Sequence, residues 1–137
     1  MPAKKISTPA ISLTISGHSN PKLVRSIIPK LTAMTCGVLD KRPEQTLVMV
    51  QFLPHELWFI SKRSLSDYGR NSFRLEFTIT DETNTKTQKA RYQQEAFELL
   101  ASEIGNVHLH SNVHVNNCRA SAYGYGGMIQ EYKFHQP

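Results

Sequence analysis

The chain has 137 residues, of which 39% are hydrophobic and 20% are charged, a composition typical of one globular domain and not of a disordered polypeptide. Its formal net charge of +5 favours anionic partners, either nucleic acid or small acidic molecules. No apolar run reaches the roughly 18–20 residues of a membrane span, and the N-terminus lacks the apolar stretch of a secretory signal. Because the two cysteines form no metal or redox motif, we expect a reducing, cytoplasmic setting.

The first half of the chain begins with a polar, basic segment, residues 1–8, which we interpret as an N-terminal arm. Residues 10–16 alternate apolar and polar side chains, which predicts a half-buried strand. Asn20 and Pro21 then stand where a helix N-cap and a first helical residue are expected. Apolar residues recur at helical spacing over 23–38, so a helix with one apolar face follows.

Pro29 falls inside this helical pattern, where its ring removes one backbone hydrogen bond. We expect a kink there, with the helix surviving because its apolar face is buried. After a polar loop, residues 47–52 are predicted to form the second strand.

The second half follows the same order of elements. Residues 73–80 alternate cleanly and predict a strand. Thr85 and Gln88 have the spacing of a capping box, which indicates that a helix begins there and covers 86–104. A returning strand is expected at 112–116.

The two halves can be overlaid as copies of one unit. Corresponding residues are 64 to 65 positions apart: Asn20 and Asn84, Val48 and Val113, Val50 and Val115, and residues 58–62 and 123–127. A strand-helix-strand unit that occurs twice predicts an α+β fold, with a four-stranded mixed sheet and both helices on one face. We expect a single domain over 9–137, with units of about 9–68 and 72–131. The other face of the sheet also carries apolar residues, and oligomerisation is the simplest way to cover it.

Four segments carry a more specific pattern than this topology. They are residues 9–17 (PAISLTISG), residues 58–60 (WFI) followed by Ser64-Leu65, residues 83–86 (TNTK) and residues 122–131 (AYGYGGMIQE). The sequence is similar, over 9–131, to the tautomerase superfamily, which includes 4-oxalocrotonate tautomerase and macrophage migration inhibitory factor, and to its double-length bacterial branch. The resemblance implies two tandem β-α-β units, assembly into a homotrimer and isomerase activity.

The resemblance also implies a catalytic proline. In the superfamily the amine of an N-terminal proline is the general base that moves a proton alpha to a carbonyl of a small anionic substrate. The matching residue here is Pro9, which eight residues precede, so its nitrogen is an amide in the intact chain. Cleavage after Thr8 would free Pro9, whereas removal of Met1 would instead leave Pro2 as a free secondary amine.

Four further residues match pocket positions of the superfamily, and each has a plain structural alternative. His18 stands in place of a substrate-binding arginine, or is an exposed turn histidine. Lys41 matches a pocket lysine, or is a solvated loop residue. Trp58 matches an aromatic pocket wall, or anchors an interface. His114 matches a pocket asparagine, or is a satisfied sheet histidine. Met49 replaces a second arginine, which argues against a dicarboxylate held by two arginines.

We expect neither a cofactor nor a metal. His108, His110 and His114 have even spacings and would share one face of a strand, but no carboxylate or cysteine joins them and the strand is expected to begin only near residue 112. Cys36 and Cys118 have no histidine partner in the sequence, so cysteine nucleophilic catalysis is a weak hypothesis.

Three functions remain open. The first is a tautomerase-like isomerase acting on a small anionic carbonyl compound. The second is a catalytically inactive binding or scaffold protein of the same fold, because Pro9 is internal. The third, nucleic-acid binding, is suggested by the basic pI and Lys4-Lys5, but the basic residues are scattered and no RNA-recognition signature is present. No membrane partner is expected.

Overall fold

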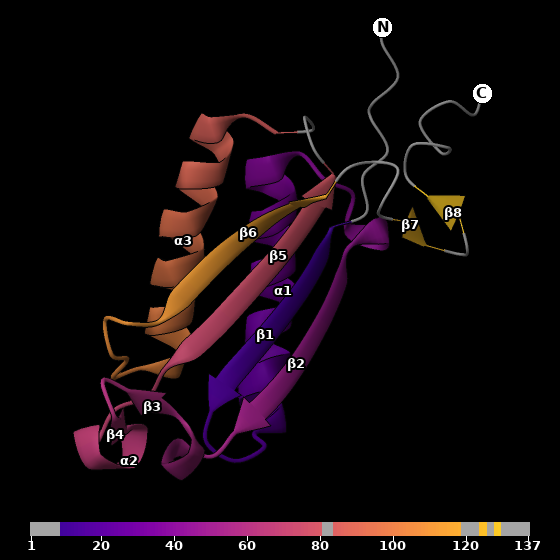
Figure 1. The fold of residues 1–137 in the computed structure, drawn as a ribbon. Helices are drawn as coiled ribbons and strands as arrows, with labels where there is room; N and C mark the ends of the chain where they lie inside the picture. Colours follow the sequence, from indigo (N-terminus) through magenta and orange to yellow (C-terminus); the bar gives the residue numbers. More distant parts are fainter. Residues whose placement is uncertain (1–8, 81–83, 119–123, 126–127, 130–137) are drawn as a thin grey trace, which may run out of the picture.

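The computed structural model describes residues 9–80, 84–118, 124–125 and 128–129 (Figure 1). The larger elements are β1 (Ala10–Ser16), α1 (Pro21–Leu39), β2 (Leu47–Leu53), β5 (Phe73–Thr80), α3 (Lys86–Ile104) and β6 (Asn112–Cys118). The smaller ones are η1 (Pro43–Gln45), η2 (His55–Leu57), β3 (Phe59–Ile60), β4 (Arg63–Ser64), α2 (Leu65–Tyr68), β7 (Gly124–Tyr125) and β8 (Met128–Ile129). The predicted arm, residues 1–8, lies outside the described residues.

The four long strands form one mixed sheet in the order β2-β1-β5-β6. Each unit contributes a parallel pair, β1 with β2 and β5 with β6, and the two units meet where β1 and β5 run antiparallel. Helices α1 and α3 pack side by side on the same face of the sheet (Figure 1). The predicted α+β architecture, a four-stranded mixed sheet with both helices on one face, is therefore confirmed. Within the described residues, no helix is both long and apolar enough to cross a membrane.

Helix α1 begins and survives as the sequence predicts. The Asn20 side chain accepts a hydrogen bond from the Leu23 backbone N–H at 3.2 Å, and Pro21 is the first helical residue. This satisfies a donor that the helix itself leaves without a partner. The helix continues through Pro29 and ends at Leu39, and the C-cap residue Asp40 takes a left-handed conformation with φ of 55°.

Helix α3 uses the predicted capping box. The Gln88 N–H donates to the Thr85 hydroxyl at 3.0 Å, and the Thr85 N–H donates to the Gln88 side chain at 2.9 Å. Asn84, the counterpart of Asn20 in the overlay, has a different role, since its amide donates to the Leu39 carbonyl at 2.8 Å. The two units thus share their topology but not this capping contact.

The hydrophobic core lies between the sheet and the two helices. Its residues come from alternate positions of the central strands and from the inner faces of the helices: Ile11, Leu13, Ile15, Ile27, Leu31, Val38, Leu39, Phe73, Leu75, Phe77, Ile79, Tyr92, Ala96 and Leu100. The Tyr92 hydroxyl is hydrogen bonded to the Thr35 hydroxyl at 3.1 Å, and both residues are fully buried. Burial raises the pKa of Tyr92 to about 12 because the ionised form would be desolvated.

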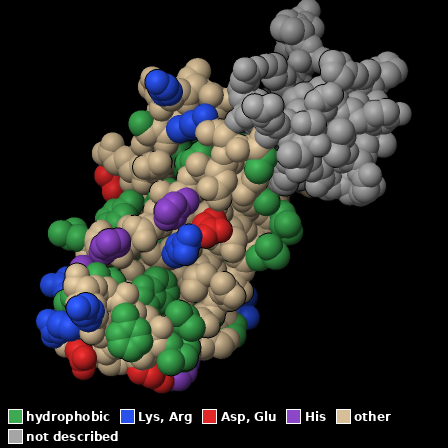
Figure 2. All heavy atoms as spheres, viewed as in Figure 1, with side chains coloured by type: hydrophobic (Ala, Val, Ile, Leu, Met, Phe, Trp, Pro, Cys, Tyr) green, Lys and Arg blue, Asp and Glu red, His purple; other side chains and the backbone are tan. Residues whose placement is uncertain are grey.

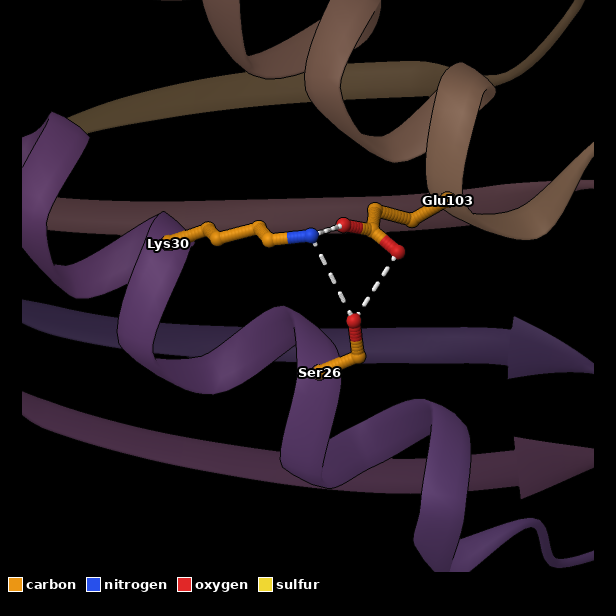
Figure 3. Close-up of polar contacts among 3 residues, drawn as sticks. All are labelled: Ser26, Lys30 and Glu103. Carbon is orange, nitrogen blue, oxygen red and sulfur yellow. Dashed lines mark hydrogen bonds and ion pairs between the residues drawn. The ribbon is translucent and has the colours of Figure 1, made fainter.

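A polar contact connects the interior of α1 with the last turn of α3 (Figure 3). Lys30 of α1 forms an ion pair with Glu103 of α3, and the Ser26 hydroxyl donates to the same carboxylate at 3.1 Å. The hydrogen bond from Lys30, assisted by that from Ser26, holds the pKa of Glu103 below its usual value.

The sheet face opposite the helices is mainly polar in its two middle strands, and the apolar residues expected on it lie on an edge strand. Ser12 and Thr14 of β1 and Glu76 of β5 point to this side, because the alternate residues of both strands fill the core. Figure 2 shows histidine, acidic and basic side chains grouped over this face. Apolar exposure is concentrated on the edge strand β2, where Leu47 is 51% and Met49 56% exposed.

A small hairpin, β3 with β4, follows β2 in the first unit. Its turn residues Ser61 and Lys62 have φ of 49° and 68°, the left-handed region that glycine adopts without strain. The corresponding pair in the second unit, β7 with β8, also forms an antiparallel hairpin. The turn glycines that separate β7 from β8, residues 126–127, lie outside the described residues.

Candidate functional site

Pro9 lies at the beginning of the first strand and is buried. Its carbonyl accepts a hydrogen bond from the Leu47 N–H at 3.0 Å, so the pairing of β1 with β2 already starts at this residue. As an internal residue, Pro9 has an amide nitrogen with no basic lone pair. The other proline considered as a base, Pro2, lies outside the described residues.

Lys41 lies at the same end of the sheet as Pro9. Helix α1 runs back along β1, and the left-handed turn at Asp40 leads directly into Lys41, whose N–H donates to the Cys36 carbonyl at 3.1 Å. Only 8% of Lys41 is exposed, so it is not the solvated loop lysine of the structural alternative. Lys41 is therefore held within the folded structure at this end of the sheet.

His18 and Trp58 lie at the opposite end. His18 is exposed in the turn between β1 and α1. Trp58 is half-buried between η2 and β3, where its carbonyl accepts a hydrogen bond from the Leu65 N–H at 2.8 Å. Pro9 and Gly17 bracket the whole of β1, eight residues apart, which at the usual strand rise corresponds to roughly 26 Å.

His114 is exposed on the edge strand β6, on the face of the sheet without helices. It pairs in register with Glu76, which in turn pairs with Ser12. One chain therefore brings Pro9 and Lys41 to one end, His18 and Trp58 to the other, and His114 to the sheet surface between them. The predicted site residues do not form a single pocket within one copy.

The structure contains a cavity that includes one of these residues. It measures about 400 Å³, and we call it the open-face cavity; its lining residues are Thr14, Gln51, Leu53, Leu57, Trp58, Phe59, Arg74 and Asn112. Trp58, Leu57 and Phe59 form its apolar wall, while the polar residues come from the sheet. Its volume falls in the range of small-molecule sites.

A second cavity of about 410 Å³ lies around η2 and α2. His55 and Asn71 both line it, and the His55 ring is hydrogen bonded to the Asn71 amide oxygen at 2.8 Å. The Asn71 amide N–H₂ donates to the Gly105 carbonyl at 2.8 Å, so the side chain joins the two units. This His–Asn pair is therefore accounted for by packing at the junction of the units.

Comparisons with known proteins were made by sequence and by structure. No protein-family model matches the chain, and no curated protein matches its sequence. By structure, a native fused 4-OT superposes with a TM-score of 0.79 at 18% identity, covering 90% of this chain and 97% of that chain. A fused 4-OT described as a symmetric trimer gives a TM-score of 0.79 at 9% identity, covering 93% and 99%. The macrophage migration inhibitory factor-like protein of Entamoeba histolytica gives 0.67 at 12% identity, covering 89% and 98%.

The chain has the fused 4-OT and MIF fold. The double-length arrangement of two β-α-β units, predicted from the sequence, is thereby confirmed at the level of fold. At these identities the likeness establishes architecture, and the chemistry depends on the residues of this chain.

Within the 4-OT/MIF fold, several residues near Trp58 were not predicted as site residues. Thr14, Gln51, Arg74 and Asn112 form the polar part of the open-face cavity. Their alternation with core residues indicated which face they occupy. Their meeting in one cavity depends on the register between strands from both units, which local patterns do not contain.

The described residues contain no group of three or more His, Cys, Asp or Glu side chains that could hold a metal. His108 and His110 precede β6 and belong to a loop in which the His110 N–H donates to His108 Nδ1 at 2.9 Å. They therefore do not share a strand face with His114. Cys36 contacts the Thr46 hydroxyl at 3.5 Å and, like Cys118, is a free thiol.

Proposed function

We propose that this protein is a tautomerase-like isomerase that moves a proton alpha to a carbonyl of a small anionic substrate. The observation that carries the proposal is the buried Lys41 at the end of the sheet where β1 begins, directly after Pro9. The 4-OT/MIF fold supports it, since it brings a proline and a cation to the same end of the sheet.

The proposed chemistry assigns the base to a free prolyl amine. An ordinary α-amino group titrates near 7.7–8.0, and a nearby ammonium group and desolvation lower that value further, toward neutral pH. Lys41 would hold the anionic substrate and stabilise the enolate that forms when the proton leaves. The amine would be that of Pro9 after cleavage following Thr8, or that of Pro2 after removal of Met1.

A complete pocket in this proposal requires more than one copy of the chain. His18 and Trp58 lie about one strand length from Pro9, so they would reach the prolyl end only from a neighbouring copy. We propose a homotrimer, in keeping with the fused 4-OT proteins described as trimers. Exposed apolar residues such as Leu57 and Phe59, 60% and 61% exposed, would contribute to its interfaces.

The test combines the intact mass with a keto–enol assay on phenylpyruvate and on 2-hydroxymuconate. Three proteins are compared: the full chain, a chain that begins at Pro9, and the same shortened chain with Pro9→Ala. If Pro9 is the base, only the second protein gives a substantial rate. If Pro2 is the base, the full chain is active and Pro2→Ala abolishes its rate.

The contribution of the cation is tested with Lys41→Gln and a matched control, Lys22→Gln, on the exposed first turn of α1. We expect Lys41→Gln to lower kcat/KM by 100-fold or more, since removal of one group that stabilises an oxyanion typically costs that much. Lys22→Gln should leave the rate unchanged. Equal rates in Lys41→Gln and the control would contradict the proposal.

A second candidate function is a catalytically inactive binding or scaffold protein. The observation that favours it is the amide nitrogen of Pro9 in the intact chain, together with Met49 on β2 in place of an arginine. In that case neither the full chain nor the chain that begins at Pro9 exceeds the rate of the Pro9→Ala control, while the oligomer remains intact.

A further inference from the structure

The last residue of helix α1 is held by a side chain of the second unit. The Asn84 amide donates to the Leu39 carbonyl at 2.8 Å, across 45 positions of the chain. A carbonyl at the end of a helix has no acceptor role left within that helix, and Leu39 is only 1% exposed, so water has little access to it. Such a buried backbone group needs a donor from elsewhere in the fold, and Asn84 supplies it.

The Asn84 amide is itself fixed by the first turn of α3. It donates a further hydrogen bond to Gln88 Oε1 at 3.1 Å, and the same oxygen accepts the Thr85 N–H at 2.9 Å. Gln88 and Thr85 are the two residues of the capping box with which α3 begins. The end of α1 is therefore anchored to the beginning of α3 through Asn84.

This anchor breaks the correspondence between the two units. In the first unit Asn20 is the N-cap, and its side-chain oxygen accepts the Leu23 N–H of its own helix. In the second unit the N-cap is Thr85, one residue later, so the Asn84 amide serves the neighbouring helix instead. The difference adds a contact between the units that an exact repeat would lack.

The anchored helix end leads directly to Lys41. Asp40 follows Leu39 with φ and ψ of 55°, a left-handed conformation that a residue with a Cβ adopts at a cost. The Lys41 N–H then donates to the Cys36 carbonyl at 3.1 Å, and the residue is only 8% exposed. If the last turn of α1 opened, the Leu39 carbonyl could bond to water and Asp40 could leave the left-handed region. The Asn84 hydrogen bond opposes this opening.

We propose that Asn84 is a positioning residue for Lys41. By holding the Leu39 carbonyl it keeps the turn at Asp40 closed, and the closed turn keeps Lys41 at the end of the sheet where β1 begins. The action of Lys41 on a substrate rests on the function proposed above, whereas its placement by Asn84 does not.

The first test measures how fast acetic anhydride acetylates Lys41 in the folded full chain, by peptide mass spectrometry at fixed pH. Asn84→Ala is compared with Asn20→Ala, because each variant removes one side-chain hydrogen bond at an end of α1. Opening of the last turn should make Lys41 react about five- to ten-fold faster in Asn84→Ala. Asn20→Ala should leave the rate unchanged. Equal rates in both variants would overturn the proposal, since general destabilisation would then account for any effect.

Substitution by aspartate at the same two positions keeps the size of the side chain. Asn84→Asp has no N–H to donate to the Leu39 carbonyl, so it should accelerate the acetylation of Lys41 as Asn84→Ala does. Asn20→Asp keeps the oxygen that accepts the Leu23 N–H, so it should change neither the rate nor the stability. Circular dichroism and urea unfolding monitor the fold of each variant. A Lys41 that stays as slow in Asn84→Asp as in the wild type would overturn the proposal.

The second test is kinetic and uses whichever form of the chain is active. Asn84→Ala should lower kcat/KM about five- to ten-fold, but should cause no further loss when Lys41→Gln is already present, because it acts through that lysine. Losses that add in the double variant would contradict the positioning role. If no form of the chain has isomerase activity, the proposed function fails, while the acetylation rates still decide whether Asn84 positions Lys41.

Discussion

The buried hydrogen bond between Tyr92 and Thr35 makes the effect of Tyr92→Phe on stability dependent on pH in a distinctive way. At pH 7 the substitution removes one partner of a 3.1 Å hydrogen bond between two fully buried residues. The Thr35 hydroxyl is then left in the core without this partner, which should cost about 1–2 kcal/mol of the free energy of unfolding. Tyr92→Phe combined with Thr35→Val removes both polar groups and should be less destabilising than the single change.

At alkaline pH the wild type loses its advantage in stability over Tyr92→Phe. A tyrosine in the unfolded chain ionises near pH 10, whereas burial raises the pKa of Tyr92 in the folded protein to about 12. The full stability is therefore present below pH 10 and is lost as the pH rises through this window, because the unfolded state loses its proton first. The loss is about 1.4 kcal/mol by pH 11 and approaches about 2.7 kcal/mol above pH 12, at about 1.36 kcal/mol per pH unit. Phenylalanine has no such loss, so the variant should become as stable as the wild type near pH 11.

The assay is urea unfolding of both proteins at several pH values from 7 to about 11, followed by circular dichroism. All other titrating groups are common to the two proteins, so their difference isolates Tyr92. A difference in unfolding free energy that stays constant between pH 9 and pH 11 would refute the reasoning.

Four further substitutions test local features of the fold. Glu103→Gln should destabilise the protein at neutral pH, and this effect should disappear as the pH falls. The reason is that the ion pair with Lys30 of α1 lowers the pKa of Glu103, and the ion pair stops contributing to stability once the carboxylate is protonated. Urea unfolding at pH 7 and at pH 3 measures the difference. Ser61→Gly and Lys62→Gly should each stabilise the protein by about 0.5–1 kcal/mol, since both residues have positive φ in the hairpin turn, and an unchanged or lower thermal midpoint would contradict this. Gly17→Ala should destabilise by about 1–2 kcal/mol, because φ is 108° and an added Cβ would lie 3.2 Å from the His55 ring; a variant as stable as the wild type would show that this turn tolerates the side chain.

The candidate site was only partly predictable, and the reason differs from residue to residue. Trp58 could be selected only because the resemblance to the tautomerase superfamily places an aromatic pocket wall there, and in this structure it lines the open-face cavity. Arg74 could not, since in the sequence it is one of several charged residues in an alternating strand. It gains its position only because β5 pairs with β1 and β6, which brings together residues from distant parts of the chain.

The sequence by itself determined the six long helices and strands and their order. Alternation over residues 10–16 and 73–80, the cap at Asn20 and the capping box at Thr85 are local signals, and each of them is confirmed. They work because hydrogen bonding and side-chain direction within one element depend on residues a few positions apart.

Only the tertiary structure decided which residues meet. The strand order β2-β1-β5-β6 makes Gln51, Thr14, Arg74 and Asn112 neighbours, although 98 positions separate the first and last of them along the chain. The fold also places Trp58 one strand length away from Pro9 and Lys41 within one chain, a separation that no spacing in the sequence indicated. The register of a sheet is decided by the packing of its buried face as a whole. Which residues become neighbours on the other face therefore follows from the fold and not from any local pattern.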